Sequence, residues 1–453
     1  MTFGKISKLM SGEADGSIFL SRLGSIAHLL TGSFAVAAVM ALSTVVAARA
    51  LGPEAYGVLA LVLTIGRICE RFIRFESWQP LIRFGTQQDI EENPEAMGSL
   101  FLLGLILDIG CALAAAVIML VGGYFILPLI GLEQSDFYLL AIFAPAIALN
   151  ITGVPTAALR LANQFRLLAY FQLFSAVLRL ILALVAWALD APLDVFLAIW
   201  TIAQIINVVV FGFLAARAFK RLGIPNPLHA KAKGLVARFP GFMGFAWSTN
   251  ASSALRTLTQ EVDTLLVGAL AGPTAAGSYH IAKRFAKVAQ QVATHVQAVI
   301  YPDLSRMWAR ARFGEVRAIK IKVQLALGSI GLLAAGAVAL VGSEGIELVF
   351  GDGFALVYPL LVTQLIAVTF IMLGAPSRST MLAMNRPRTV LEIAVVATAV
   401  FFAIALTLIP DVGAIGANYA HVAACAVTAI LLEITFHLAY RTHHSAEVEA
   451  KGL

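Results

Sequence analysis

Residues 57–80 of the chain read GVLALVLTIGRICERFIRFESWQP, an apolar stretch about as long as a membrane span that nevertheless carries charged side chains near its middle. An arginine at the centre of a spanning helix costs roughly 2.5–3.5 kcal/mol to insert, so several of them are not expected to face lipid. The sequence therefore predicts that they face protein or a water-filled cavity. The charged residues are spaced i, i+3, i+4 and i+7, which places them in one stripe on a helix: Arg67, Glu70, Arg71 and Arg74.

A second polar stripe occurs in residues 276–301. A shift of 220 positions aligns Arg67 of the first stripe with Lys287 of the second. Two polar-striped spans in corresponding places suggest that two halves of the chain enclose one polar cavity. The second stripe consists of His280, Lys283, Arg284, Lys287, Gln290, Gln291, Thr294 and His295.

The overall composition is typical of a membrane protein. Of 453 residues, 60% are hydrophobic and only 13% are charged, and the mean hydropathy is +0.87. We therefore expect an all-α protein that crosses the membrane many times. The net charge of +6 is interpreted as a topology signal, so no nucleic-acid partner is expected. Cys69, Cys111 and Cys425 lie far apart within apolar stretches, which indicates neither a metal site nor a disulfide framework.

Apolar segments of about 20 residues, the length that crosses a bilayer, predict twelve transmembrane helices. The connections that follow odd-numbered spans contain no Lys or Arg, whereas most of the other connections are basic. By the positive-inside rule both termini are expected in the cytoplasm. The predicted spans are 26–50, 56–79, 97–121, 137–160, 167–189, 194–216, 240–270, 275–301, 320–341, 354–384, 389–410 and 413–437.

Short motifs recur in the same order in the two halves. Gly52-Pro53 with Gly57 recurs as Gly272-Pro273 with Gly277, in both cases at a predicted tight turn. Asn163 with Arg166 recurs as Asn385 with Arg388, and Pro80, which is expected to end a span, corresponds to Pro302. Six spans per half give both halves the same orientation, so a pseudo-twofold axis is expected along the membrane normal, with substrate sites at the repeat interface.

The expected organisation is two six-helix lobes joined by a basic linker. A cytoplasmic N-terminal segment (1–25) precedes the N-lobe (26–216), and a cytoplasmic linker (217–239) leads to the C-lobe (240–438) and a cytoplasmic tail (439–453).

Anions are the expected ligands of the two stripes, because guanidinium groups bind phosphate through two parallel hydrogen bonds. In the seventh span, Glu261 and Asp263 are expected to pair with the bases of the eighth span or to carry a coupling proton or sodium ion, and Glu70 is expected to act likewise. The alternative for the first stripe is that its charges neutralise one another and join helices. The predicted substrate contacts are Arg67, Arg71, Arg74, Lys283, Arg284, Lys287 and Arg256.

No motif for catalysis, for a cofactor or for a metal is present in the sequence. It lacks a phosphate-cradling glycine loop, a nucleophile elbow and a His/Cys/Asp set with metal-ligand spacing. We therefore expect neither an enzyme nor a cofactor-binding protein.

Four stretches resemble a known family. RALGPEAYGVLALVLTI (49–65) and RFESWQPLIRFG (74–85) in the first half, and VDTLLVGALAGPTAAGSYHIAKRF (262–285) and VIYPDLSRM (299–307) in the second, resemble segments of polysaccharide transporters. These are the Wzx-type flippases of lipid-linked oligosaccharides, within the multidrug/oligosaccharidyl-lipid/polysaccharide exporter superfamily.

The resemblance implies a V-shaped transporter with a central cationic cavity, built on two lobes. Its substrate would be an oligosaccharide linked to undecaprenyl diphosphate, such as an O-antigen or exopolysaccharide repeat unit, and a polymerase and a chain-length regulator would be possible partners. It would move this substrate from the cytoplasmic to the periplasmic leaflet of a bacterial inner membrane by alternating access, without a cofactor but with a proton, sodium or membrane-potential driving force. The alternatives are a cation-coupled drug antiporter of the same superfamily and a membrane-embedded glycan polymerase or ligase.

Overall fold

The computed structural model describes residues 16–75, 77–87, 92–230, 232 and 234–450, and these residues form helices and no strands. Within these ranges, the structure does not describe the side chains of residues 16–31, 33, 165, 166, 169, 251–260 and 442–450. The long helices are α2 (Gly16–Ile73), α5 (Pro94–Ile126), α6 (Phe137–Ala148), α8 (Phe165–Ala188), α9 (Leu193–Leu222), α11 (Phe242–Ala309), α12 (Phe313–Phe350), α13 (Val357–Ala383), α14 (Pro387–Val412) and α15 (Ala414–Ala450). The short elements are α3 (Trp78–Gly85), α7 (Gly153–Leu161), α10 (Leu235–Arg238) and the 3-10 turns η1 (Leu127–Ile130), η2 (Gln134–Asp136) and η3 (Pro227–His229).

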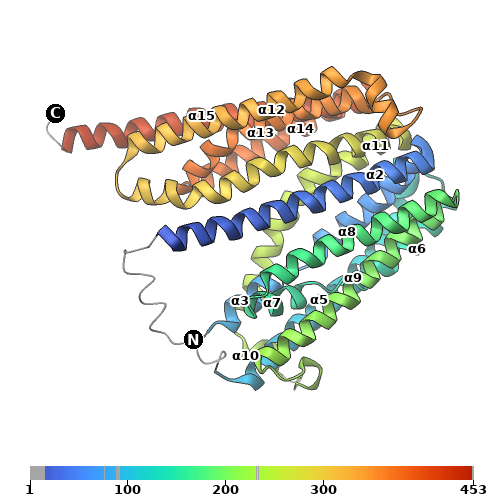
Figure 1. The fold of residues 1–453 in the computed structure, drawn as a ribbon, viewed down its shortest axis with the longest axis horizontal. Helices are drawn as coiled ribbons and strands as arrows, with labels where there is room; N and C mark the ends of the chain where they lie inside the picture. The colour runs from blue at the N-terminus through green and yellow to red at the C-terminus, as the bar shows by residue number, and fades with distance from the viewer. Residues whose placement is uncertain (1–15, 76, 88–91, 231, 233, 451–453) are drawn as a thin grey trace.

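The helices form two groups that lie together at one end of the molecule and diverge towards the other (Figure 1). Helices α12 to α15 pack with α11 on one side, and α5 to α9 pack together on the other. The N-terminal arm of α2 runs between the two groups. The start of α2 and the end of α15 both lie at the diverging end, which we call the open end (Figure 1).

The distribution of buried side chains explains this shape. At the closed end a single apolar core joins the two groups, and it contains Leu61 of α2, Ile281 of α11 and Leu360 of α13. Towards the open end the groups have separate cores, one around Phe101 of α5 and one around Phe436 of α15. Because helices in a bilayer are held together by close packing of their side chains, the shared core joins the two groups at the closed end.

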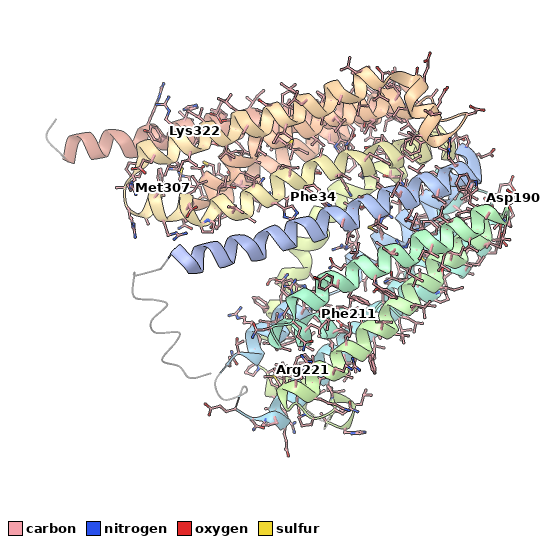
Figure 2. The ribbon with its side chains drawn as sticks, viewed as in Figure 1. Phe34, Asp190, Phe211, Arg221, Met307 and Lys322 are labelled. Carbon is pink, nitrogen blue, oxygen red and sulfur yellow. The ribbon has the colours of Figure 1, made fainter. Side chains whose placement is uncertain are left out.

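Basic side chains gather towards the open end. In Figure 2, Arg221 and Lys322 lie towards this end, whereas Asp190 lies at the closed end. This segregation follows the alternation of basic and acidic connections that the sequence shows. The cytoplasmic position of the termini stays a prediction.

Two long helices are sharply bent at equivalent glycines. Gly52 (φ 72°, ψ 175°) breaks α2 and Gly272 (φ 83°, ψ 171°) breaks α11, with nearly the same backbone conformation. A left-handed φ favours glycine, and the following proline supplies the start of the next arm. The two second arms then cross at Gly57 and Gly277, where a Cβ on Gly277 would lie 2.8 Å from the Cα of Gly57. The repeated motif therefore forms a backbone-to-backbone contact between the two halves.

The predicted fold class, an all-α polytopic membrane protein, is confirmed. Nine described helical segments are long and apolar enough to cross a membrane, and the segment that contains the Gly52 bend is one of them. Helix α11 is not among the nine, because charged and polar residues lower its hydropathy. Counting the two arms of α2 and of α11 as separate crossings is compatible with the twelve that the sequence predicts, and the two groups are compatible with the predicted lobes.

Several predicted span boundaries were wrong. The predicted span 56–79 ends at Ile73, because the ring of Pro80, in the first turn of α3, clashes with the carbonyl that a continuous helix would present four residues earlier. The predicted span 137–160 agrees with the candidate span Gln134–Leu161, although the helix is interrupted within it between α6 and α7, before Pro155. Pro302 does not end a span, since α11 continues to Ala309. The predicted cytoplasmic connection 302–319 shrinks to three residues, 310–312.

Candidate functional site

Two cavities lie on either side of the N-terminal arm of α2, and Met40 lines both. The first, which we call the N-cavity, has a volume of 510 Å³ and is enclosed by α2, α7, α8 and α9. The second, the central cavity, has a volume of 270 Å³ and lies between α2 and α11. The polar residues of the N-cavity are Arg71, Arg74, Trp78, Thr152, Thr156, Arg160, Gln172, Ser175, Arg179, Gln204 and Asn207. Those of the central cavity are Arg67, Glu261, His280, Lys283, Arg284, Lys287 and Gln291.

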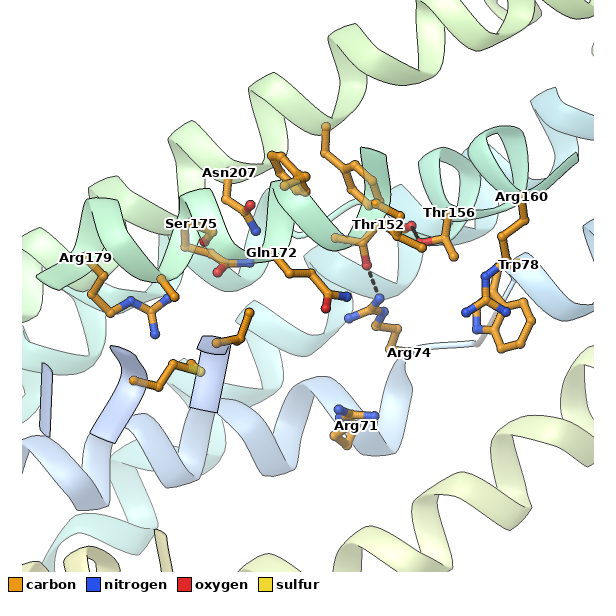
Figure 3. Close-up of a pocket in the computed structure, with 17 residues that line it drawn as sticks. Arg71, Arg74, Trp78, Thr152, Thr156, Arg160, Gln172, Ser175, Arg179 and Asn207 are labelled. Atoms are coloured by element: carbon orange, nitrogen blue, oxygen red, sulfur yellow. Dashed lines mark hydrogen bonds between the residues drawn. The ribbon is translucent and has the colours of Figure 1, made fainter. Parts of the chain in front are cut away.

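A hydrogen-bonded framework holds the end of α2 against the N-cavity. Arg74 donates to Glu70 and to the hydroxyl of Thr152, as Figure 3 shows for the second contact. Asn150 donates to the Glu70 carboxylate (Nδ2 to Oε1, 2.7 Å) and accepts from Gln204 (Nε2 to Oδ1, 3.1 Å). The break between α6 and α7 makes this possible, because it brings unwound polar backbone and side chains to the membrane interior where they line a cavity.

Buried Asp108 of α5 stabilises this break from behind. Its carboxylate accepts from the hydroxyl of Ser77 at 2.5 Å and from the backbone N–H of Val154, in the first turn of α7, at 2.9 Å. A carboxylate at a helix N-terminus satisfies an unpaired N–H and interacts favourably with the helix dipole.

Two arginines of the N-cavity have no hydrogen bond or ion pair to any described residue. Arg71 is exposed on α2, and Arg179 reaches in from α8 (Figure 3). The Arg179 Nε is buried without a partner, and its guanidinium carbon lies 5.7 Å from the ring centre of Trp200. At the opposite end of the row in Figure 3, the Arg160 guanidinium stacks on Trp78 at 3.9 Å. No carboxylate is among the described side chains that line this cavity.

In the central cavity, one carboxylate is shared between two bases from different helices. Glu261, on the first arm of α11, lies 3.3 Å from Nε of Arg67 and 3.4 Å from Nζ of Lys287. The Arg67 side chain is one-third exposed, so its guanidinium still faces the cavity. Arg284 also lines the cavity and makes no ion pair with a described residue. The central cavity is therefore cationic overall.

A hydrogen-bonded chain connects this cavity to the closed end. The Nη2 of Arg67 lies 3.4 Å from Nε2 of His280, whose Nδ1 lies 3.0 Å from the hydroxyl of buried Tyr56. Because a guanidinium only donates, Nε2 accepts, and a neutral imidazole then donates from Nδ1 to the tyrosine. This chain joins α2 and α11 beside the Gly57 crossing.

Behind the central cavity, a fully buried carboxylate holds Lys283. Asp263 accepts from Lys283 Nζ at 2.5 Å, from the Tyr279 hydroxyl at 2.9 Å, from His421 Nε2 of α15 at 2.8 Å and from the backbone N–H of Thr264 at 2.7 Å. The Lys283 side chain is only 8% exposed. It therefore lines the cavity wall with its positive charge already neutralised.

The predicted site residues are brought together, but their surroundings differ. Arg71 and Arg284 are unpaired among the described residues, Arg74 and Lys283 are ion-paired, and Arg67 and Lys287 share Glu261. The predicted contact Arg256 lies in α11 within 251–260, whose side chains lie outside the description. The role of the predicted basic residues as substrate contacts stays a prediction. So does the coupling role of the acids Glu70, Glu261 and Asp263. Among the described residues, no three His, Cys, Asp or Glu side chains are placed to hold a metal.

The sequence interpretation did not recognise the polar stripes of α8 and α9. Gln172, Ser175 and Arg179 lie at i, i+3 and i+7 on α8, and Gln204 and Asn207 at i and i+3 on α9. These are polar stripes in otherwise apolar helices, the same signal that identifies the stripe on α2. Arg160, near the end of α7, carries no comparable signal.

Comparisons with known proteins agree with this architecture. A model of the family described as "Polysaccharide biosynthesis protein" matches residues 46–359. The inner membrane protein YghQ of Escherichia coli (strain K12) is 29% identical over 291 residues, which cover 63% of this chain and 80% of that protein.

Among solved structures, the inward-facing conformation of a multidrug resistance MATE family transporter of the MOP superfamily superposes with a TM-score of 0.72 at 13% identity, over 90% of this chain and 96% of that one. The lipid II flippase MurJ, in an inward closed conformation, superposes with a TM-score of 0.67 at 15% identity, over 90% and 87%. These superpositions show that the chain has the fold of these two proteins.

Proposed function

Because the chain belongs to the polysaccharide biosynthesis protein family, we propose that it is a flippase for an oligosaccharide linked to undecaprenyl diphosphate. It moves this substrate from the cytoplasmic to the periplasmic leaflet of the bacterial inner membrane by alternating access. The inner-membrane location is supported by the name of the E. coli relative, and the flippase activity by the likeness to MurJ, which is a flippase of lipid II. The driving force is a proton, a sodium ion or the membrane potential.

The observation that carries this proposal is the convergence of unpaired or shared cations from both helix groups on two adjoining cavities. Arg284 of α11 and Arg71 of α2 are unpaired among the described residues, and Arg67 and Lys287 share one carboxylate. Unbalanced cations inside a membrane are unfavourable unless water or an anion faces them. A diphosphate provides several acceptor oxygens for such guanidinium and ammonium groups.

The geometry supports loading from the open end. The two helix groups diverge there, so the diphosphate and sugars can enter the cavities while the isoprenoid tail stays in the bilayer. At the closed end, the Tyr56–His280–Arg67 chain and the Gly57 crossing hold the groups together. A phosphate that binds Arg67 competes with Glu261 and His280 for its N–H groups. Substrate binding therefore weakens the contacts that must break before the cavity opens to the other side.

The test is flipping by the purified protein in liposomes, with a fluorescent undecaprenyl-diphosphate oligosaccharide as substrate. Arg284→Gln is compared with Arg310→Gln, since Arg310 is exposed at the end of α11. Loss of one charge-assisted contact is expected to reduce the apparent affinity or rate about 10- to 100-fold. The control is expected to match the wild-type protein.

Three results would contradict the proposal. Equal flipping by protein-free and protein-containing liposomes would exclude a flippase for this substrate. Uptake of a cationic drug, without flipping of the oligosaccharide lipid, would establish that the protein is a drug antiporter. A chemical change in the glycan would establish a polymerase or ligase, since a flippase leaves its substrate unaltered.

A further inference from the structure

The N-cavity contains two buried polar atoms that have no partner among the described residues. Nε of Arg179 on α8 is a donor without an acceptor, and Oδ1 of Asn207 on α9 is an acceptor without a donor. Both residues line the same cavity. Buried polar groups are normally hydrogen-bonded, so each unpaired one calls for an explanation. A ligand that carries both an anionic acceptor and a hydroxyl donor would satisfy both.

The rest of the lining supports a carbohydrate ligand. Gln172 and Ser175 add an amide and a hydroxyl on the same face of α8, and Thr156 adds a hydroxyl from α7. At the far end, the Trp78 ring presents an aromatic surface, one face of which carries the Arg160 guanidinium. A few placed hydrogen-bonding groups in a partly apolar cavity orient a ligand. The cavity volume of 510 Å³ accommodates sugar residues rather than a long chain.

The N-cavity adjoins the position proposed for the diphosphate. Met40 lines both cavities. A diphosphate in the central cavity therefore places the first sugars of the glycan in the N-cavity. The cation–π contact with Trp200 uses the face of the Arg179 guanidinium and leaves its N–H edge for a ligand.

We propose that the N-cavity is a glycan subsite that selects an acidic sugar, whose carboxylate is bound by Arg179 and whose hydroxyl donates to Asn207. This inference rests on the proposed flippase function and adds a substrate class to it. A guanidinium recognises a carboxylate through two parallel hydrogen bonds, which a neutral sugar cannot replace. The subsite therefore discriminates between glycans that differ only in this group.

The experiment compares two undecaprenyl-diphosphate oligosaccharides that are identical except for one sugar, a hexuronate in the first and the corresponding hexose in the second. Flipping of both is measured in liposomes for the wild-type protein, for Arg179→Gln and for Arg217→Gln. Arg217 is the matched control, because it lies exposed on α9 outside the cavity. Asn207→Asp is the second test variant, since it adds a carboxylate to the same cavity without removing the arginine.

The wild-type protein and Arg217→Gln are expected to flip the uronate glycan about 10- to 100-fold more efficiently than the hexose glycan. Arg179→Gln and Asn207→Asp are expected to lose this preference, because neither variant offers an unpaired guanidinium to the carboxylate. Equal flipping of both glycans by the wild-type protein, or a preference that survives in both variants, overturns the subsite and leaves the flippase proposal intact. Failure of the wild-type protein to flip either glycan overturns the proposed function itself, and with it this inference.

Discussion

Replacing Lys283 by methionine distinguishes between two roles of this residue, a structural ion pair and a contact with the substrate. Lys283 was predicted to bind phosphate, yet its Nζ lies 2.5 Å from Oδ1 of Asp263, a carboxylate with no exposed surface. The substitution keeps the apolar stem and removes the charge, so it leaves the buried carboxylate without its counter-ion. We expect Lys283→Met to destabilise the protein and to lower transport only through that loss.

The magnitude follows from the partners that remain. Removing one member of a buried ion pair typically costs about 3–5 kcal/mol. Asp263 keeps the Tyr279 hydroxyl, His421 Nε2 and the N–H of Thr264 as donors, at 2.9, 2.8 and 2.7 Å. These contacts spread part of the negative charge, so we expect the free energy of unfolding to fall by about 2–3 kcal/mol. Adding Asp263→Asn removes the unpaired charge and is expected to restore about half of this loss.

The assay is a double-mutant cycle on unfolding by sodium dodecyl sulfate in mixed micelles, followed by circular dichroism. Lys322→Met is the control, because Lys322 is exposed on α12 (Figure 2), and its effect should stay within about 0.5 kcal/mol. A coupling energy between Lys283 and Asp263 below about 0.5 kcal/mol would refute the reasoning. A double variant that is stable but does not flip the substrate would show that Lys283 contacts the substrate.

Three further predictions concern the contact between the halves and the cavity charge. Gly57→Ala places a methyl group against the backbone of the opposite helix, so it should lower the free energy of unfolding by about 1–3 kcal/mol. Gly336→Ala is the control and should not lower it, because a methyl group there meets open space. Equal effects of the two substitutions on thermal unfolding would contradict this contact. Tyr56→Phe removes the hydroxyl that accepts from His280, a hydrogen bond that contributes about 1 kcal/mol. We expect a larger fraction of molecules in which the two helix groups separate at the closed end, as measured by distances between spin labels on the two groups. An unchanged distance distribution would show that this hydrogen bond does not hold the closed end together. Arg71→Gln should reduce flipping about tenfold without changing the melting temperature, because its guanidinium has no described partner; unaltered flipping would remove it from the site.

The motifs that the sequence repeats proved to be local backbone features. Gly52 and Gly272 adopt the same left-handed conformation, and so do Asn163 (φ 55°) and Asn385 (φ 58°). Such positions can be recognised from the sequence, because glycine and asparagine are the residues that tolerate positive φ at a helix end or bend. The correspondence of Pro80 with Pro302 was misleading for the opposite reason. A proline within a helix breaks it in one context and is accommodated in another, and the packing around it decides which.

The pairing of charges was predicted only in part: Asp263 pairs with Lys283 and Glu261 with Lys287, as expected for the seventh and eighth spans. The i, i+3 and i+4 spacing suggested partners within one span, and only Glu70 with Arg74 follows that rule in the described part of the first stripe. Arg67 instead pairs with Glu261, 194 positions away, and Asp263 accepts from His421, 158 positions away. Which acid reaches which base depends on how helices cross, and crossing is set by packing rather than by spacing.

The sequence by itself determined that the chain is helical and membrane-embedded, that it turns at Gly52 and Gly272, and which helix faces carry charge. These properties follow from local chemistry: a bilayer excludes unpaired backbone and charge, and glycine and proline set backbone angles wherever they stand. Only the tertiary structure decided that the cations divide between two cavities, that Lys283 is neutralised while Arg71, Arg179 and Arg284 are not paired with any described carboxylate, and that α8 and α9 complete the site. The physical reason is that neutralisation and cavity formation depend on distances between helices, which the packing of the whole chain sets.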